Sequence, residues 1–200
     1  MKLTLSGEQL NFFSRHGFLE LEEFVKNIDE LSDALDVLVH CHKGDRKYNI
    51  VLEDEKVGRA LSLKILGEIV HLLVNQRPVR YAFDRFSHPE RGQTIEEVSS
   101  VVPIIMTAVI ALEDGNDSSV LWQPFIYSGM PQKRGSVCFV SPKVSWEVKK
   151  TNQRCLIIGF TNERAVYRFQ EGDPNIHFLK KQGYVFGDAL SEKTHPSVYR

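Results

Sequence analysis

Hydrophobic positions in the first part of the chain recur at helical spacing. A capping-box pattern at Ser6 and Gln9 predicts a helix that closes at Gly17. A second apolar series predicts a helix over residues 28–40, and a third predicts a longer helix over residues 57–75. The opening of the chain is therefore expected to be mainly helical.

Alternating apolar and polar side chains, which are typical of strands, dominate the second part. Residues 18–21 already alternate, and residues 79–86 do so after the third helix. Asp173 and Pro174 then predict the start of a short helix that ends at Gly183. Turn-forming residues separate further predicted strands near 101–112, 120–127, 136–141, 144–149, 154–160 and 164–169.

This order of elements indicates an α+β fold. Helices followed by six or seven short strands favour a sandwich or barrel over a parallel sheet with alternating helices. We expect one domain over residues 1–200, because this length is ordinary for a single core. Its parts would be a helical opening over 1–78, a strand core over 79–170, and a short helix and tail over 171–200.

Composition narrows the classes of partner and compartment. The 200 residues are 42% hydrophobic and 26% charged, with a formal net charge of −1, so nothing favours a nucleic-acid backbone as partner. The amino-terminal segment has no apolar run of signal-peptide type, and no run approaches the roughly 20 apolar residues that span a bilayer. We expect a cytoplasmic protein without a membrane segment. The oligomeric state stays open.

Cysteine usage agrees with a reducing compartment. Cys41, Cys138 and Cys155 are odd in number and show no CxxC spacing. Two of them lie in apolar strand-like runs, where free cysteines are commonly buried. The prediction is reduced core thiols in a cytoplasmic protein.

Four segments resemble phytanoyl-CoA-dioxygenase-like proteins, which are Fe(II)/2-oxoglutarate oxygenases. Residues 15–24 are similar to the amino-terminal opening of that family, and residues 107–114 to a strand with an acidic turn. Residues 135–139 resemble its glycine-led strand before the distal metal ligand, and residues 152–158 its last core strand. The resemblance implies a double-stranded β-helix (jelly-roll) core with the amino-terminal helices packed on one sheet.

The resemblance also implies where an iron site would lie. Such a site uses two histidines and one carboxylate and leaves positions open for cosubstrate and oxygen. His88 and Glu90 have the histidine-x-carboxylate form and are the candidate metal ligands, with a turn-rich surface loop around Pro89 as the competing interpretation. At the distal position Ser145 or Trp146 stands in place of histidine. Because a hydroxyl binds such metals weakly and an indole has no available lone pair, the triad is expected to be incomplete.

Arg154 is the candidate cofactor-binding residue. It stands near the start of the segment that resembles the last core strand, where the family carries an arginine for the cosubstrate carboxylate. A guanidinium can hold a carboxylate through two parallel hydrogen bonds. The competing interpretation is an arginine at a strand end that is solvated or paired with a carboxylate such as Glu147.

Three functions follow as hypotheses. The first is an oxygenase-like protein without an intact triad that binds a small carboxylate or an apolar ligand. The second is an active dioxygenase in which His88, Glu90 and a shifted third ligand hold Fe(II), and Arg154 holds 2-oxoglutarate. Hydrolases and phosphate-loop enzymes have no support, since the sequence lacks a Gly-x-Ser-x-Gly elbow and a glycine-rich phosphate loop.

The third hypothesis is a metal-responsive regulatory protein that binds DNA. His40, Cys41 and His42 form the densest group of metal-capable side chains. Residues two apart on a helix point in different directions, so the two histidines share one ion only if the helix has ended between them. The balanced charge argues against a basic recognition helix. His195, at the other end of the chain, is expected in a frayed tail.

Overall fold

The structure is a computed structural model. It describes residues 4–41, 49–87, 99–115, 121–123, 126–128, 131–146, 153–173 and 175–200. The helices of these ranges are α1 (Gly7–His16), α2 (Ile28–Cys41), α3 (Ile50–Glu53), α4 (Glu55–Ala60), α5 (Leu63–Val74) and α6 (Ile176–Lys181). None of them combines the length and apolar character needed to cross a bilayer.

Three sheets are formed by the described strands. A six-stranded sheet has the order β1-β7-β4-β9-β2-β11, and all its neighbours are antiparallel. A two-stranded ribbon pairs β10 with β3, and a three-stranded sheet has the order β5-β6-β8. The strands are β1 (Phe18–Leu21), β2 (Val79–Ser87), β3 (Val101–Val102), β4 (Met106–Ala111), β5 (Leu121–Gln123), β6 (Ile126–Ser128), β7 (Val137–Val140), β8 (Ser145–Trp146), β9 (Cys155–Thr161), β10 (Val166–Tyr167) and β11 (Ser197–Tyr199).

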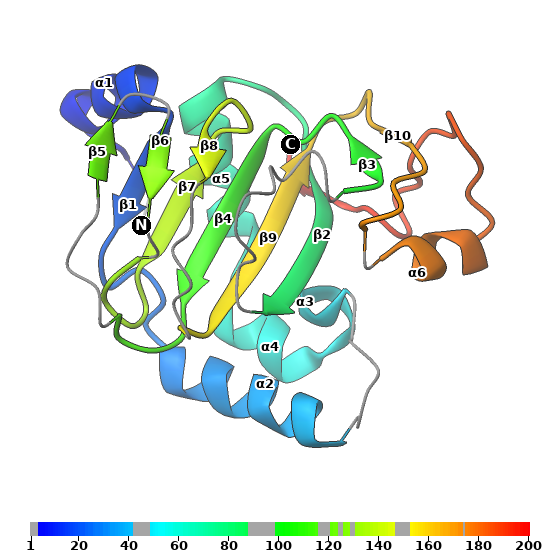
Figure 1. The fold of residues 1–200 in the computed structure, drawn as a ribbon, viewed down its shortest axis with the longest axis horizontal. Helices are drawn as coiled ribbons and strands as arrows, with labels where there is room; N and C mark the ends of the chain where they lie inside the picture. The colour runs from blue at the N-terminus through cyan, green and yellow to red at the C-terminus, as the bar shows by residue number, and fades with distance from the viewer. Residues whose placement is uncertain are drawn as a thin grey trace.

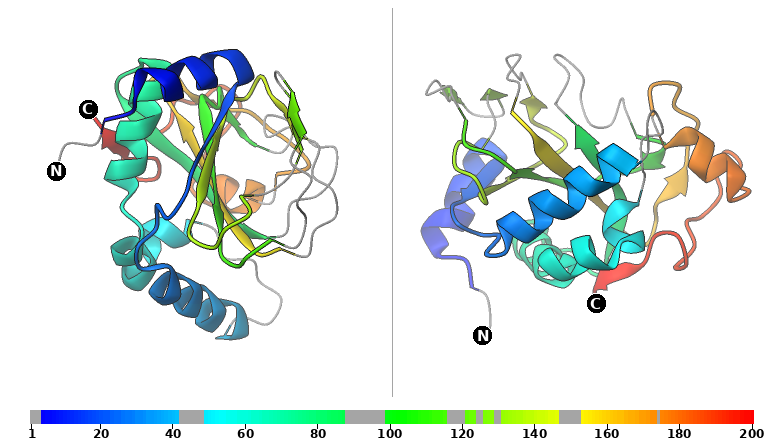
Figure 2. Two further views of the ribbon diagram at one scale, coloured as in Figure 1. Left: turned by 90° about the vertical axis from the view of Figure 1, so that its left-hand side faces the viewer. Right: turned by 90° about the horizontal axis from the view of Figure 1, so that it is seen from below.

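The six-stranded sheet lies between two different layers. Helices α2 to α5 cover one face, which we call the helix face. The three-stranded sheet lies on the side of the opposite face, which we call the inner face (Figures 1 and 2). Alternation along the strands sends successive side chains to opposite faces. On β9, for example, Leu156, Ile158 and Phe160 join the core beneath the helices, whereas Cys155 and Ile157 belong to a second core on the inner face.

Local signals explain where several elements begin and end. Ser6 Oγ accepts from the Gln9 amide at 3.1 Å, and the Gln9 side chain accepts from the Ser6 amide at 2.8 Å. Gly17 follows α1 in the left-handed conformation, with a φ of 79°. The predicted capping box and glycine stop are thus confirmed. The antiparallel sheet and the packing of helices on one of its faces agree with the predicted α+β class.

Four predicted elements differ from the structure. The single strand expected over 120–127 is two strands, β5 and β6, which pair with each other in antiparallel orientation. The helix expected over 57–75 is divided, because Leu61 is extended and Ser62 caps a new helix by accepting from the Ile65 amide. The strand expected over 101–112 is interrupted at Pro103, which has no N–H for a ladder. Asp173 does not cap α6; its carboxylate instead accepts from the backbone amides of Ser100 and Asn175, at 2.6 and 2.7 Å.

Candidate functional site

The inner face of the six-stranded sheet is mainly apolar. Strands β4, β7 and β9 contribute side chains that are at most 7% exposed, and β2 adds Phe83. Covering residues come from the β3–β10 ribbon, from α6 and from the segment that follows α6. The side chains that the four central strands contribute to this core are Ala82, Phe83, Val109, Cys138, Val140, Cys155 and Ile157.

Two buried thiols belong to this face. Cys138 and Cys155 are buried and form no disulfide among the described residues, which confirms their predicted place in the core. Burial raises the pKa of the Cys155 thiol far above its ordinary value, and the charge of Arg85 opposes the shift only in part. The thiolate is the form that binds metals, so Cys155 is a poor ligand here. The side chain of Cys41 lies outside the described residues.

Arg85 is a cation on the inner face that the sequence analysis did not single out. It pairs with Ile157 in the β2–β9 ladder and lies two residues from Phe83, on the same side of β2. Its positive charge acts on both Cys155 and Asp173, lowering the pKa of each against the effect of burial. Arg85 is half-buried. It is therefore a charged group at the margin of an otherwise apolar surface.

Arg154 lies on the opposite side of the sheet. It precedes Leu156 by two positions and shares its orientation toward the helices. Its guanidinium forms an ion pair with Asp36 of α2 and lies 5.6 Å from the centre of the Phe86 ring. The side chain thus points to the helix face, whereas the resemblance to oxygenases implied the barrel interior. Pairing with a carboxylate was the competing interpretation, although the partner is Asp36. A cofactor-binding role for Arg154 stays a prediction.

The predicted metal ligands lie in segments that the structure does not describe. His88 and Glu90 lie outside the described residues, and so do His42 and the side chains of His40 and Cys41. The backbone of β8 is described, and it places Ser145 beside Ile126 in a parallel ladder. Because β8 consists of Ser145 and Trp146 alone, it contains no histidine.

The donor set of the described inner face does not fit a three-ligand iron centre. No group of three histidine, cysteine, aspartate or glutamate side chains comes together among the described residues. Cys138 and Cys155 are buried thiols, and β8 consists of Ser145 and Trp146, neither of which is a residue type that usually binds iron. We therefore derive no chemical step through a metal.

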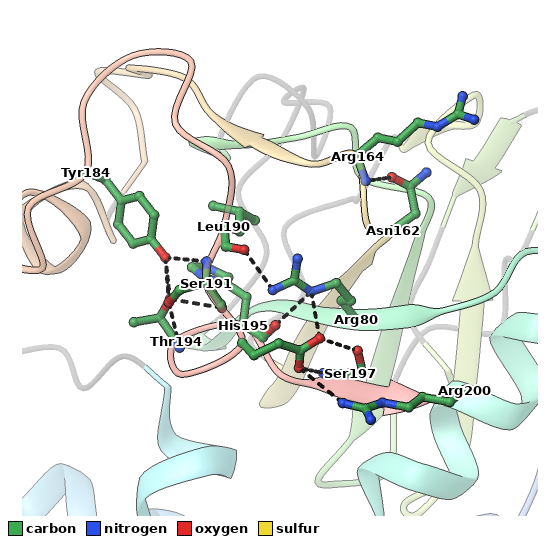
Figure 3. Close-up of polar contacts among 11 residues, drawn as sticks. Arg80, Asn162, Arg164, Tyr184, Leu190, Ser191, Thr194, His195, Ser197 and Arg200 are labelled. Atoms are coloured by element: carbon green, nitrogen blue, oxygen red, sulfur yellow. Dashed lines mark hydrogen bonds and ion pairs between the residues drawn. The ribbon is translucent and has the colours of Figure 1, made fainter.

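The carboxyl-terminal segment is fixed to β2 by a buried arginine. Arg80 is 5% exposed, and it donates to the carbonyl oxygens of Leu190 and His195, both at 2.9 Å (Figure 3). Thr194 Oγ1 lies 2.8 Å from His195 Nδ1 and 2.5 Å from Tyr184 Oη. Burial lowers the pKa of His195 to about 4, and the Arg80 charge adds to this effect. The prediction of a frayed tail around His195 is wrong, because sequence periodicity carries no sign of this long-range contact.

Comparison with solved structures identifies the fold. The chain superimposes on the non-haem α-ketoglutarate-dependent carbocyclase SnoK from nogalamycin biosynthesis with a TM-score of 0.69 and 14% identity, over 96% of each chain. The chain has the fold of the non-haem α-ketoglutarate-dependent enzymes. EctD from S. alaskensis, solved with 2-oxoglutarate and 5-hydroxyectoine, gives a TM-score of 0.64 at 10% identity over 98% of this chain and 87% of that one.

A second likeness is to CT296 from Chlamydia trachomatis, with a TM-score of 0.52 and 14% identity over 80% of this chain and 97% of that one. Neither a family model nor a curated protein sequence matches the chain. The oxygenase-type fold implied by the sequence resemblance is thus confirmed. At these identities the likeness carries the fold, and function depends on the residues of the chain itself.

Proposed function

We propose that this chain uses the oxygenase fold, with its sheets arranged as a double-stranded β-helix, to bind a small carboxylic acid with an apolar body. The protein would lack a working two-histidine, one-carboxylate iron triad. The observation that supports the proposal is that β8 consists of Ser145 and Trp146, in the segment where the resemblance to the oxygenases implies the distal histidine. Without the third ligand the fold would lack the metal chemistry, and a small molecule could be held between its sheets instead.

The inner face suits such a ligand. Phe83 and Ile157, which are 8% and 7% exposed, would offer apolar contact to the body of the molecule once it enters beside Arg85. Arg85, on the same face, supplies a guanidinium that can form charge-assisted hydrogen bonds with a carboxylate. Arg154 is the less suitable group, since it shares the orientation of Leu156 toward the helix face and pairs there with Asp36.

A titration with matched variants tests the proposal. Phenylpyruvate and 2-oxoglutarate serve as probes, and binding is measured by calorimetry in the presence of EDTA. The wild-type protein should bind phenylpyruvate more tightly than 2-oxoglutarate, because the aromatic body gains apolar contact. Arg85→Gln should weaken binding at least about tenfold, the effect of losing a charge-assisted hydrogen bond. Arg154→Gln, the matched control, should leave affinity unchanged.

Two results would count against the proposal. If neither phenylpyruvate nor 2-oxoglutarate binds, the proposal that the protein binds a small carboxylic acid is wrong. Loss of binding in Arg154→Gln with full binding in Arg85→Gln would assign the carboxylate to Arg154 instead.

The alternative is an active Fe(II)/2-oxoglutarate dioxygenase with altered ligands, which the shared fold favours. His88 and Glu90 would then hold iron with a third group. Fe(II)-dependent binding of 2-oxoglutarate that disappears in His88→Ala would support this alternative over the metal-free ligand site.

A further inference from the structure

A turn after α6 presents two large apolar side chains to solvent. Val185 is 64% exposed and Phe186 is 76% exposed. The turn is nevertheless well ordered by hydrogen bonds: the Val185 amide donates to the Asp188 carboxylate at 2.8 Å, and the Asp188 amide donates to the Val185 carbonyl at 3.1 Å. Gly183 and Gly187 flank it in left-handed conformations, with φ values of 87° and 88°. Val185 and Phe186 thus form a contiguous exposed apolar surface, and it is such contiguous surface, not a single side chain, that marks interaction sites.

Two lysine side chains lie close to this turn in the sequence. Lys180 and Lys181 form the last turn of α6, just before Gly183. Lys180 Nζ lies 4.5 Å from the centre of the Phe169 ring, which is itself 49% exposed. The turn is tied to β10 near Phe169, because the Gly187 amide donates to the Tyr167 carbonyl at 2.8 Å. We call Phe169, Lys180, Lys181, Val185, Phe186 and Asp188 the basic tip, because its two lysines outnumber its one carboxylate.

A groove of opposite character lies between α2 and α4. It encloses about 620 Å³, and Ala34, Val37 and Leu38 form its apolar part. Val37 is 58% exposed although it is apolar. Four carboxylates and two cations complete the lining, which gives the groove an acidic balance: Glu30, Asp33, Asp54, Glu55, Lys56 and Arg59. We call it the acidic groove.

We propose that the basic tip of one copy of this chain docks in the acidic groove of a second copy. The apolar side chains at the tip, Val185 and Phe186, match the apolar part of the groove, and the two lysines match its excess of carboxylates. Helices α6 and α2 lie on different sides of the molecule, so tip and groove are separate surfaces of one copy (Figures 1 and 2). The contact is heterologous, because it joins two different surfaces. A closed dimer forms only when each copy places its basic tip in the acidic groove of the other.

Phe186 is expected to dominate the contact. Large aromatic side chains that enter a partner pocket are the usual anchors of interfaces, whereas rim charges mainly affect rate and salt dependence. Truncating such an anchor weakens association at least about 30-fold. Raised salt should weaken association further, since the lysines and carboxylates at the rim are screened.

Sedimentation equilibrium on the full chain and two variants tests the contact. Phe186→Ser removes the anchor, and Val37→Glu places a charge in the apolar part of the groove. Each variant alone should stay monomeric up to about 100 µM, where wild-type protein associates. An equimolar mixture should regain association, because the intact tip of Val37→Glu fits the intact groove of Phe186→Ser. Leu10→Ser, which removes another exposed apolar side chain, should associate like wild type.

Three outcomes would overturn the proposal. One is a wild-type chain that stays monomeric at these concentrations, and another is unchanged association in both variants. The third is a mixture that remains monomeric although both single variants have lost association. A wild-type monomer that binds phosphatidylserine vesicles through Phe186 would assign the basic tip to a membrane surface instead.

Discussion

The two faces of the six-stranded sheet differ in what they bury. The helix face is closed by α2 to α5 and joins large apolar side chains into one core, including Phe139, Phe160 and Tyr81, all fully buried. The inner face carries a smaller core with two thiols, and Arg85 lies at its margin. The contrast indicates that the helix face maintains stability and that the inner face is the side on which residues can be exchanged for function.

The largest expected effect tests this contrast with one substitution made on each face. Phe160→Ala, on the helix face, should lower the free energy of unfolding by about 3–5 kcal/mol, because it leaves a closed cavity. Phe83→Ala, on the neighbouring strand but on the inner face, should cost less than Phe160→Ala, since Phe83 is 8% exposed and belongs to the smaller core. Urea denaturation measures both. Equal costs would contradict the contrast.

The second effect concerns a buried carboxylate on the helix face. Asp84 is fully buried and accepts from the Val51 amide at 2.8 Å. Desolvation raises its pKa from 3.8 to about 6. Because the folded pKa is the higher one, the folded state favours the protonated acid. Its stabilising contribution is complete below about pH 4 and is lost as the pH rises through 6.

Asp84→Asn retains the acceptor for Val51 and removes the charge. It should raise the free energy of unfolding at pH 8 by up to about 3 kcal/mol and change it little at pH 4. Urea denaturation at a series of pH values measures the effect. A variant that is destabilised equally at both pH values would show that Asp84 is stabilising in its charged form.

Some elements of this structure could be predicted from the sequence and others could not. Elements with a local signal were predictable: the capping box at Ser6 fixed the start of α1, and the alternation over 79–86 gave β2. The division of the third predicted helix at Leu61 was not, since the apolar series continues across it. Extended backbone at one residue leaves no trace in a pattern of period 3.6.

Features of the candidate site that depend on residue type could be predicted from the sequence. Features that depend on which face of the sheet a side chain takes could not. The residue types of β8, Ser145 and Trp146 with no histidine, can be read from the sequence. The orientation of Arg154 cannot, because one position of register decides which face of a strand a side chain takes. Arg85 was overlooked for the same reason, although its place two residues after Phe83 in an alternating strand was an available signal.

A third prediction examines how closely the inner face is packed. A Cβ added at Gly159 would lie 2.3 Å from Cε1 of Phe83. Gly159→Ala should therefore destabilise the protein by about 2 kcal/mol, the usual cost of overpacking. In a Phe83→Ala background the same change should be nearly neutral, which a double-mutant cycle can show. An unchanged cost in that background would mean that another neighbour limits the space.

The smallest expected effect concerns the ion pair between Arg154 and Asp36. Their side chains are 30% and 41% exposed, so solvent screens the pair. Arg154→Gln and Asp36→Asn should each cost less than about 1 kcal/mol. The two changes together should cost less than their sum, as measured in a double-mutant cycle by urea denaturation. Strict additivity would indicate that the pair contributes nothing.

The central claim is that an oxygenase fold persists here without a working iron triad. The most direct test is release of carbon dioxide from 2-oxoglutarate by the purified protein supplied with Fe(II) and ascorbate, compared with the same protein in EDTA. We predict equal release in the two samples, and no difference between wild type and His88→Ala. Fe(II)-dependent turnover that is lost in His88→Ala would contradict the account and establish a dioxygenase with altered ligands.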